Sequence, residues 1–158
     1  MRVNLKRLSQ RSPNLFQEIR AMRGRRIAFD YGDVRIGLGV CDPDGILCTP
    51  LPAIRTGDPK LFVTIEGILN EYQPVAIYVG LPLHMSGESG ESAEKARAFG
   101  REISDRFKIP VRYVDERLST VSAQKKLKDA GVSSRDAKEL IDSMAAVSIL
   151  EQGLLSES

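Results

Sequence analysis

Three acidic residues stand where a lone carboxylate is unfavourable: Asp30, Glu116 and Asp142. Asp30 ends the apolar run 27–29, Glu116 follows the strand-like segment 111–114, and Asp142 lies inside an otherwise apolar helical segment. A carboxylate at such a position needs a partner, and carboxylate oxygens suit a hard divalent cation such as Mg²⁺ or Mn²⁺. If the fold brings the three together, the chemistry they predict is metal-dependent cleavage of a phosphodiester.

Two of these carboxylates have neighbours that suit the same chemistry. Gly32 would let a phosphate or a metal ion approach the backbone beside Asp30, although an Asp-x-Gly sequence is equally typical of a simple turn. Arg117 is placed to hold a phosphate next to Glu116. Asp115 and Glu116 point to opposite sides of an extended segment, so we expect one ligand and favour Glu116. The alternative is a solvated loop in which these charges pair with one another.

Asp142 shares one side of its expected helix with small residues. By three- and four-residue spacing, that side carries Lys138, Asp142, Ala145, Ala146 and Ile149. The two alanines would let this side of the helix approach a sheet closely. The alternative is an ion pair between Asp142 and a cation such as Lys138 or Arg101.

One histidine, His84, lies in the glycine-containing segment 79–90, which follows an apolar strand. Such a loop suits a polyanion, and a histidine there could donate a proton or contact a phosphate because its charge changes near neutral pH. The alternative is an exposed loop histidine with no role.

The hydrophobic pattern predicts three hairpin-linked strands followed by alternating helices and strands. The expected strands are 25–31, 36–41, 46–54, 75–79 and 111–114, and the expected helices are 14–22, 58–72, 89–107, 119–130 and 134–152. Asp58 is the expected N-cap of its helix, and Pro50 and Pro52 place their strand at an edge. This order predicts an α/β fold with a mixed five-stranded sheet and helices on both faces. Asp30 and Glu116 then lie at strand carboxyl ends, near one crevice.

Composition bounds the remaining choices. The chain has 158 residues, 42% hydrophobic and 28% charged, which is typical of one soluble domain. Residues 1–26 contain eight Lys or Arg and one Glu, and this basic arm suggests contact with phosphates or a solubilising tail. With no secretory signal and no run near the roughly 20 apolar residues of a membrane helix, we expect a cytoplasmic protein. The expected organisation is an arm over 1–24, a domain over 25–152 and a tail over 153–158.

Cys41 and Cys48 flank the turn that follows the second expected strand. Two reduced thiols are expected in the cytosol, with an intramolecular or intermolecular bridge as the alternatives. Two cysteines and one histidine are too few for a four-ligand zinc site.

Four motifs, in order along residues 24–152, resemble the YqgF/RuvX family. They are Asp30-Tyr31-Gly32 with Arg35-Ile36-Gly37, Val79-Gly80-Leu81-Pro82-Leu83, Asp115-Glu116-Arg117-Leu118-Ser119-Thr120 and Asp142-Ser143-Met144-Ala145-Ala146. That family comprises proteins regarded as Holliday junction resolvases or as nucleases that mature the 5′ end of pre-16S rRNA. The resemblance implies an RNase H-like fold, with Asp30, Glu116 and Asp142 as metal ligands and Arg35 and Arg117 as substrate-binding or site-orienting residues. The family's loop usually continues with Asn where this chain has His84.

The expected function is therefore an endonuclease that cleaves structured nucleic acid by two-metal-ion hydrolysis, with Asp30 bridging two Mg²⁺ or Mn²⁺ ions. Processing of pre-16S rRNA is the first expectation. The alternative is a Holliday junction resolvase, which would act as a two-fold dimer with Cys41 or Cys48 as a candidate contact. Two other classes are a non-catalytic RNA-binding protein and an actin-like nucleotide-binding domain, and one 158-residue domain is too short for the latter.

Overall fold

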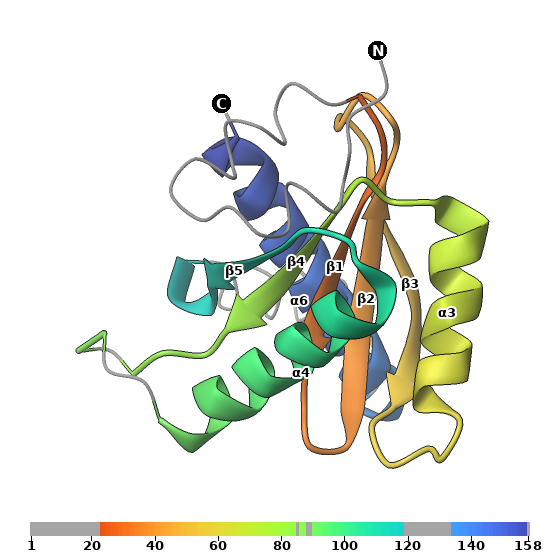
Figure 1. Ribbon diagram of the computed structural model, residues 1–158. Helices are drawn as coiled ribbons and strands as arrows, with labels where there is room; N and C mark the ends of the chain where they lie inside the picture. Colours follow the sequence, from red (N-terminus) through yellow and green to blue (C-terminus); the bar gives the residue numbers. More distant parts are fainter. Residues whose placement is uncertain (1–22, 85, 88–89, 119–133, 158) are drawn as a thin grey trace.

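A five-stranded mixed sheet forms the centre of the molecule in the computed structural model, which describes residues 23–84, 86–87, 90–118 and 134–157 (Figure 1). The strands are β1 Arg26–Tyr31, β2 Arg35–Cys41, β3 Cys48–Arg55, β4 Ala76–Leu81 and β5 Val111–Asp115. They lie in the order β3-β2-β1-β4-β5. The first three form an antiparallel meander, and β4 and β5 run parallel to β1. The expected mixed sheet and the edge position of β3 are confirmed.

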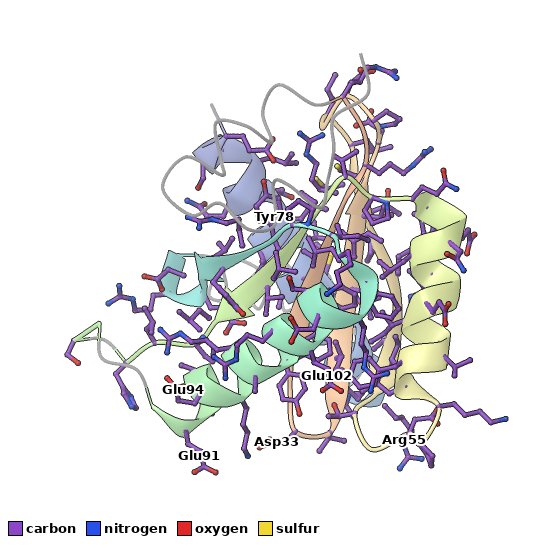
Figure 2. The ribbon with its side chains drawn as sticks, viewed as in Figure 1. Asp33, Arg55, Tyr78, Glu91, Glu94 and Glu102 are labelled. Carbon is purple, nitrogen blue, oxygen red and sulfur yellow. The ribbon has the colours of Figure 1, made fainter. Side chains whose placement is uncertain are left out.

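Helices cover both faces of this sheet (Figure 1). They are α3 Leu61–Tyr72, α4 Glu91–Phe107 and α6 Ser134–Ser156, and a 3₁₀ turn, η1 Glu116–Leu118, follows β5. α3 and α4 pack on one face and α6 on the other. The solvent side of α4 is charged and carries Glu91, Glu94 and Glu102 (Figure 2). The expected three-layer, RNase H-like architecture is confirmed.

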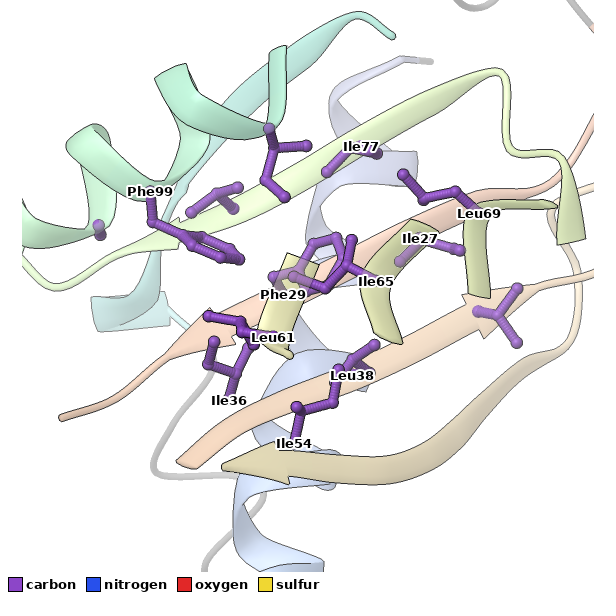
Figure 3. Close-up of a cluster of buried hydrophobic side chains, with 14 of the residues drawn as sticks. Ile27, Phe29, Ile36, Leu38, Ile54, Leu61, Ile65, Leu69, Ile77 and Phe99 are labelled. Carbon is purple, nitrogen blue, oxygen red and sulfur yellow. The ribbon is translucent and has the colours of Figure 1, made fainter. Parts of the chain in front are cut away.

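The alternating pattern of each strand produces two cores. On one face, Ile27 and Phe29 of β1 pack with residues of α3 and α4, and the Phe29 and Phe99 rings meet edge to face at 5.5 Å (Figure 3). On the other face, Ala28 packs against α6 in a smaller cluster that includes Ile149. Because side chains alternate along a strand, the residue after Phe29 projects on the α6 face. That residue is Asp30.

Two helix boundaries differ from expectation. α3 begins at Leu61 rather than Asp58, because Asp58 Oδ1 accepts the Lys60 N–H at 2.8 Å and the Asp58 carbonyl accepts the Leu61 N–H at 3.0 Å. Asp58 therefore closes a turn ahead of the helix, and its expected role as N-cap is wrong. α6 ends at Ser156, four residues after the expected position, and Glu157 beyond it is buried.

The expected helices over 14–22 and 119–130 lie outside the described residues. Within the described ranges, no helix is both long enough and apolar enough to cross a membrane.

Candidate active site

Asp30 lies on β1 between two strands that carry glycines beside it. Gly37 of β2 is its direct partner, and the parallel register of β1 with β4 brings Gly80 to its other side. Asp30 projects on the α6 face, the same face as Ala28. Because neither neighbouring strand has a side chain at this level, side chains from other elements can approach the backbone beside Asp30 closely.

The Glu116 carboxylate lies directly over Gly80. A Cβ atom placed on Gly80 would lie 2.3 Å from Glu116 Oε1 and 2.4 Å from Ile149 Cδ1. Glu116 Oε1 is buried. Neighbouring strands are about 4.8 Å apart, so Asp30 and Glu116 face one space on the α6 side although 86 positions separate them in sequence. The structure thus brings these two predicted residues together.

Helix α6 crosses this face close to the sheet backbone. A Cβ atom on Gly39 of β2 would lie 3.2 Å from both the backbone nitrogen and Cγ2 of Val147, and Ala146 is fully buried. Asp142 belongs to α6, four residues before Ala146. Its side chain lies outside the described part of the chain, so the third predicted carboxylate is located only by its place in the helix.

Asp115 forms an ion pair with Arg117. Arg117 Nη2 lies 2.5 Å from Asp115 Oδ2, and Arg117 Nε donates to both carboxylate oxygens at 3.0 and 2.9 Å. These hydrogen bonds from Arg117 hold the pKa of Asp115 below its ordinary value. The geometry directs Asp115 toward Arg117, an ion pair of the kind that the alternative interpretation of this segment expected, and leaves Glu116 over Gly80.

His84 is exposed and lies at the start of α4. Its ring approaches Gly90, where a Cβ atom would lie 2.5 Å from Nε2, and its carbonyl accepts the Gly87 N–H at 2.8 Å. Arg117 Nη1 donates to the same carbonyl at 3.3 Å. Arg117 therefore connects the loop after β4 to the residues that follow β5, and the loop contact that it makes at His84 was not evident from the sequence.

Gly32 forms the tight turn between β1 and β2. Its N–H donates to the Arg35 carbonyl at 3.0 Å, and a Cβ atom at this position would lie 2.6 Å from that oxygen. Thr56 Oγ1 donates to the Gly32 carbonyl at 2.7 Å, which fixes the turn against the end of β3. The turn interpretation of Gly32 accounts for this geometry, and Arg35 begins the strand that follows.

The donor set fits a hard divalent cation. Asp30 and Glu116 present carboxylate oxygens to a space whose floor is Gly80, and a Cβ atom there would clash with Glu116 Oε1. Within the described ranges no group of three His, Cys, Asp or Glu is arranged to hold a metal ion, and the Asp142 carboxylate is outside those ranges. In the sequence, the only sign that Gly80 matters is that it is a glycine within an apolar strand.

Both cysteine thiols are free in the described structure. Cys41 of β2 and Cys48 of β3 are direct partners across the two strands. Burial raises the pKa of the Cys41 thiol, and it raises the pKa of the Cys48 thiol to about 12. Because Cys41 is buried, it offers no surface for a contact between subunits.

Comparison with known proteins identifies the family to which the chain is similar. The family model described as "RuvX: Holliday junction resolvase" matches residues 24–156. A Streptomyces coelicolor protein named "Putative pre-16S rRNA nuclease" is 44% identical over 140 residues, which cover 87% of this chain and 84% of that protein. A Rhodococcus erythropolis protein of the same name is 45% identical over 141 residues, which cover 85% of this chain and 79% of that protein.

Among solved structures, "T. thermophilus RuvC in complex with Holliday junction substrate" is similar with a TM-score of 0.49 at 16% identity, covering 77% of this chain and 91% of that one. The matched segment spans every strand of the sheet and contains Asp30, Glu116 and Asp142. The chain therefore belongs to the RuvX family of nucleases.

Proposed function

We propose that this nuclease is a metal-dependent endonuclease whose site is formed by Asp30, Glu116 and Asp142. The observation that supports it best is the Glu116 carboxylate lying over Gly80, on the same sheet face as Asp30. Two carboxylates directed to one partly buried space repel each other, and a bound cation would offset that repulsion.

Mg²⁺ or Mn²⁺ would be held by Asp30, Glu116 and Asp142, with Asp30 as the central ligand. Such ions, when bound, lower the pKa of the attacking water and stabilise the leaving oxygen. Asp142 precedes Ile149 by seven residues, about two helical turns, so it lies on the side of α6 that reaches Gly80.

The chain's own residues also shape the approach of the substrate. Gly37 carries no side chain beside Asp30, and the absence of one at Gly80 accommodates the Glu116 carboxylate. Arg117 neutralises Asp115 and holds the turn at His84, so it orients the loop beside the site, and Arg35, His84 and Gly32 are candidate substrate contacts.

The substrate that we propose first is the 5′ end of pre-16S rRNA, because the curated relatives at 44–45% identity carry that name. A four-way DNA junction is the second candidate, because the family model is described as a Holliday junction resolvase. A resolvase must cut two strands symmetrically, so this candidate requires a two-fold dimer. An rRNA-processing role places the protein in the cytoplasm, with the arm over 1–24 as a candidate RNA contact.

The test is cleavage by the full chain of a 5′-labelled pre-16S rRNA fragment and of a four-way DNA junction, each with Mg²⁺, Mn²⁺ or EDTA. We expect a discrete cut in the RNA that requires metal. Paired symmetric cuts in the junction, with the RNA intact, would favour the resolvase instead. Binding of RNA with neither substrate cut under any condition would contradict the proposal and support a non-catalytic RNA-binding protein.

Gly80→Ala is expected to displace Glu116 from the site. The added Cβ would lie 2.3 Å from Glu116 Oε1 and 2.4 Å from Ile149 Cδ1, so both side chains must move. A shift of about 1 Å in a catalytic group can lower a rate by about 10²-fold, and overpacking of this kind costs about 1–3 kcal/mol of stability. The cleavage rate and urea unfolding of the same variant measure the two effects.

Gly67→Ala in α3 is the matched control. Nothing lies within 4 Å of a Cβ atom at Gly67, so this variant should gain about 0.5–1 kcal/mol of stability from helix propensity and keep the wild-type rate. Equal rates for wild type, Gly67→Ala and Gly80→Ala would show that Glu116 does not act from this position.

A further inference from the structure

Two arginines lie directly opposite each other across strands β2 and β3. Arg35 begins β2, Arg55 ends β3, and the two are Cα partners in the antiparallel register. The next pair, Val34 and Thr56, is joined by a hydrogen bond from the Thr56 N–H to the Val34 carbonyl at 2.9 Å. Since bonded and non-bonded pairs alternate, Arg35 and Arg55 occupy a non-hydrogen-bonded position, where opposite side chains are closest.

The register places two positively charged residues side by side. Like charges directly opposite each other on neighbouring strands repel. Arg55 is exposed and Arg35 is partly buried, so the pair has access to an anion from solvent. Two neighbouring guanidinium groups form a suitable site for a phosphate, since each guanidinium can donate paired hydrogen bonds to the phosphate oxygens.

The pair lies on the sheet face that carries Asp30. Ile36 packs into the core beneath α3 and α4, so Arg35, its neighbour in the strand, projects on the α6 side, and Arg55 shares that side through the register. Gly37, the partner of Asp30, is two residues from Arg35, about 7 Å along the strand. Figure 2 shows Arg55 at the lower end of the sheet, the end that also carries Asp33 of the β1–β2 turn.

The backbone that presents the two arginines is well braced. Thr56, next to Arg55, donates its hydroxyl to the Gly32 carbonyl and its N–H to the Val34 carbonyl. These bonds tie the end of β3 to the turn that precedes Arg35. The two side chains therefore project from a fixed corner of the sheet, which reduces the entropy lost when a ligand is bound.

We propose that Arg55 and Arg35 together bind one backbone phosphate of the substrate strand, next to the phosphodiester at Asp30 and Glu116. This inference rests on the proposed nuclease function and adds to it a position, Arg55, where the strand is held. Arg55 acts by binding and does not contact the reacting atoms. The contact is to a phosphate, so it is independent of base sequence.

The test compares Arg55→Gln with Lys108→Gln. Lys108 is the C-cap residue that follows α4, so its substitution removes one charge ahead of β5, at the opposite end of the sheet from Arg55. Affinity for the labelled pre-16S rRNA fragment and for the four-way DNA junction is measured in EDTA, where no cleavage occurs, over a range of salt concentrations. We expect Arg55→Gln to weaken binding about tenfold. The slope of log K against log salt should become shallower by about 0.7 to 0.9, the value for one phosphate contact.

With metal present, Arg55→Gln should raise KM and change kcat by less than about twofold. The lost contact would stabilise the bound substrate and the transition state equally. The double variant Arg35→Gln/Arg55→Gln should lose less affinity than the two single losses combined, since both residues contact the same phosphate. Lys108→Gln should match wild type in all of these measurements.

Wild-type affinity and salt slope for Arg55→Gln, in a protein that cleaves nucleic acid, would overturn the phosphate contact and leave the nuclease function standing. Failure of the wild-type protein itself to bind or cut either substrate would overturn both. A lower Tm for Arg55→Gln would identify a structural ion pair and also overturn the contact, because relief of like-charge repulsion predicts an unchanged or higher Tm.

Discussion

Asp30→Asn and Glu116→Gln are each expected to lower the rate of nucleic-acid cleavage by about 10³-fold or more. Each change keeps the size of the side chain and removes the charge that a divalent cation requires. A loss of about 10³-fold corresponds to about 4 kcal/mol of transition-state stabilisation, within the several kcal/mol that a bound metal supplies. Single-turnover cleavage of the preferred substrate in Mg²⁺ and in Mn²⁺ measures the effect.

The same variants should be as stable as wild type, or more stable, when unfolded by urea in EDTA. Asp30 and Glu116 face one space, so neutralising either relieves their mutual repulsion, which a bound cation would offset. Asp142→Asn should behave in the same way if its carboxylate completes the site. A stability loss of several kcal/mol with an unchanged cleavage rate would instead identify these carboxylates as members of structural ion pairs.

Asp115→Asn is the matched control for Asp30→Asn. Asp115 is paired with Arg117, so its loss should loosen the turn at His84 and lower the rate by less than tenfold. An effect as large as that of Glu116→Gln would show that Asp115, and not Glu116 alone, serves the metal. The comparison tests whether Glu116 or Asp115 is the metal ligand. From the sequence, the alternation of side chains along an extended segment indicated a single ligand but did not decide which of the two it is.

The parts of the fold that the sequence predicted are those governed by local periodicity. The apolar run 27–29 correctly predicted a strand, and the structure places Ile27 and Phe29 on one face and Ala28 on the other. The start of α3 was wrong because Asp58 and Pro59 suit a turn as well as they suit a helix N-terminus. Local propensity alone could not decide between the two.

The candidate site was predictable to the extent that strand carboxyl ends meet at one edge of a parallel sheet. From this rule, the sequence alone predicted that Asp30 and Glu116 lie at the same edge of the sheet. The exact seat of Glu116 over Gly80 was not predictable, because it depends on the pairing of β4 with β1 and β5 and on the side chain of Ile149. Long-range register of this kind is not encoded in a short window of sequence.

The largest feature that the sequence did not reveal is a buried ion pair between the two ends of the domain. Arg26 of β1 and Glu157 after α6 are 4% and 7% exposed. Arg26 Nε donates to Glu157 Oε1 at 3.1 Å, and Arg26 Nη2 donates to Oε2 at 3.2 Å. The Tyr78 hydroxyl donates to Glu157 Oε1, and burial raises the Tyr78 pKa well above its ordinary value (Figure 2). With 131 positions between them, no periodicity relates these two charges.

Glu157→Ala is expected to lower the free energy of unfolding by about 3–5 kcal/mol. The change removes the carboxylate that accepts bidentate hydrogen bonds from a buried guanidinium, and it also removes the acceptor of the Tyr78 hydroxyl. Urea unfolding followed by circular dichroism measures the loss. Because this cost comes from an uncompensated charge, Arg26→Met/Glu157→Leu should recover most of the stability.

Glu102→Ala is the matched control for this prediction, since it removes a glutamate that pairs with Arg106 on the exposed face of α4. An exposed pair of this kind contributes about 0.3–0.5 kcal/mol, so the two Glu→Ala variants should differ by several kcal/mol. Similar losses for both would show that the Arg26–Glu157 pair contributes no more than a surface pair. If the difference is as large as expected, the Arg26–Glu157 pair anchors the end of α6 to the first strand. Because Ile149 of α6 lies beside Glu116 at Gly80, this ion pair then also helps to fix the position of the Glu116 carboxylate.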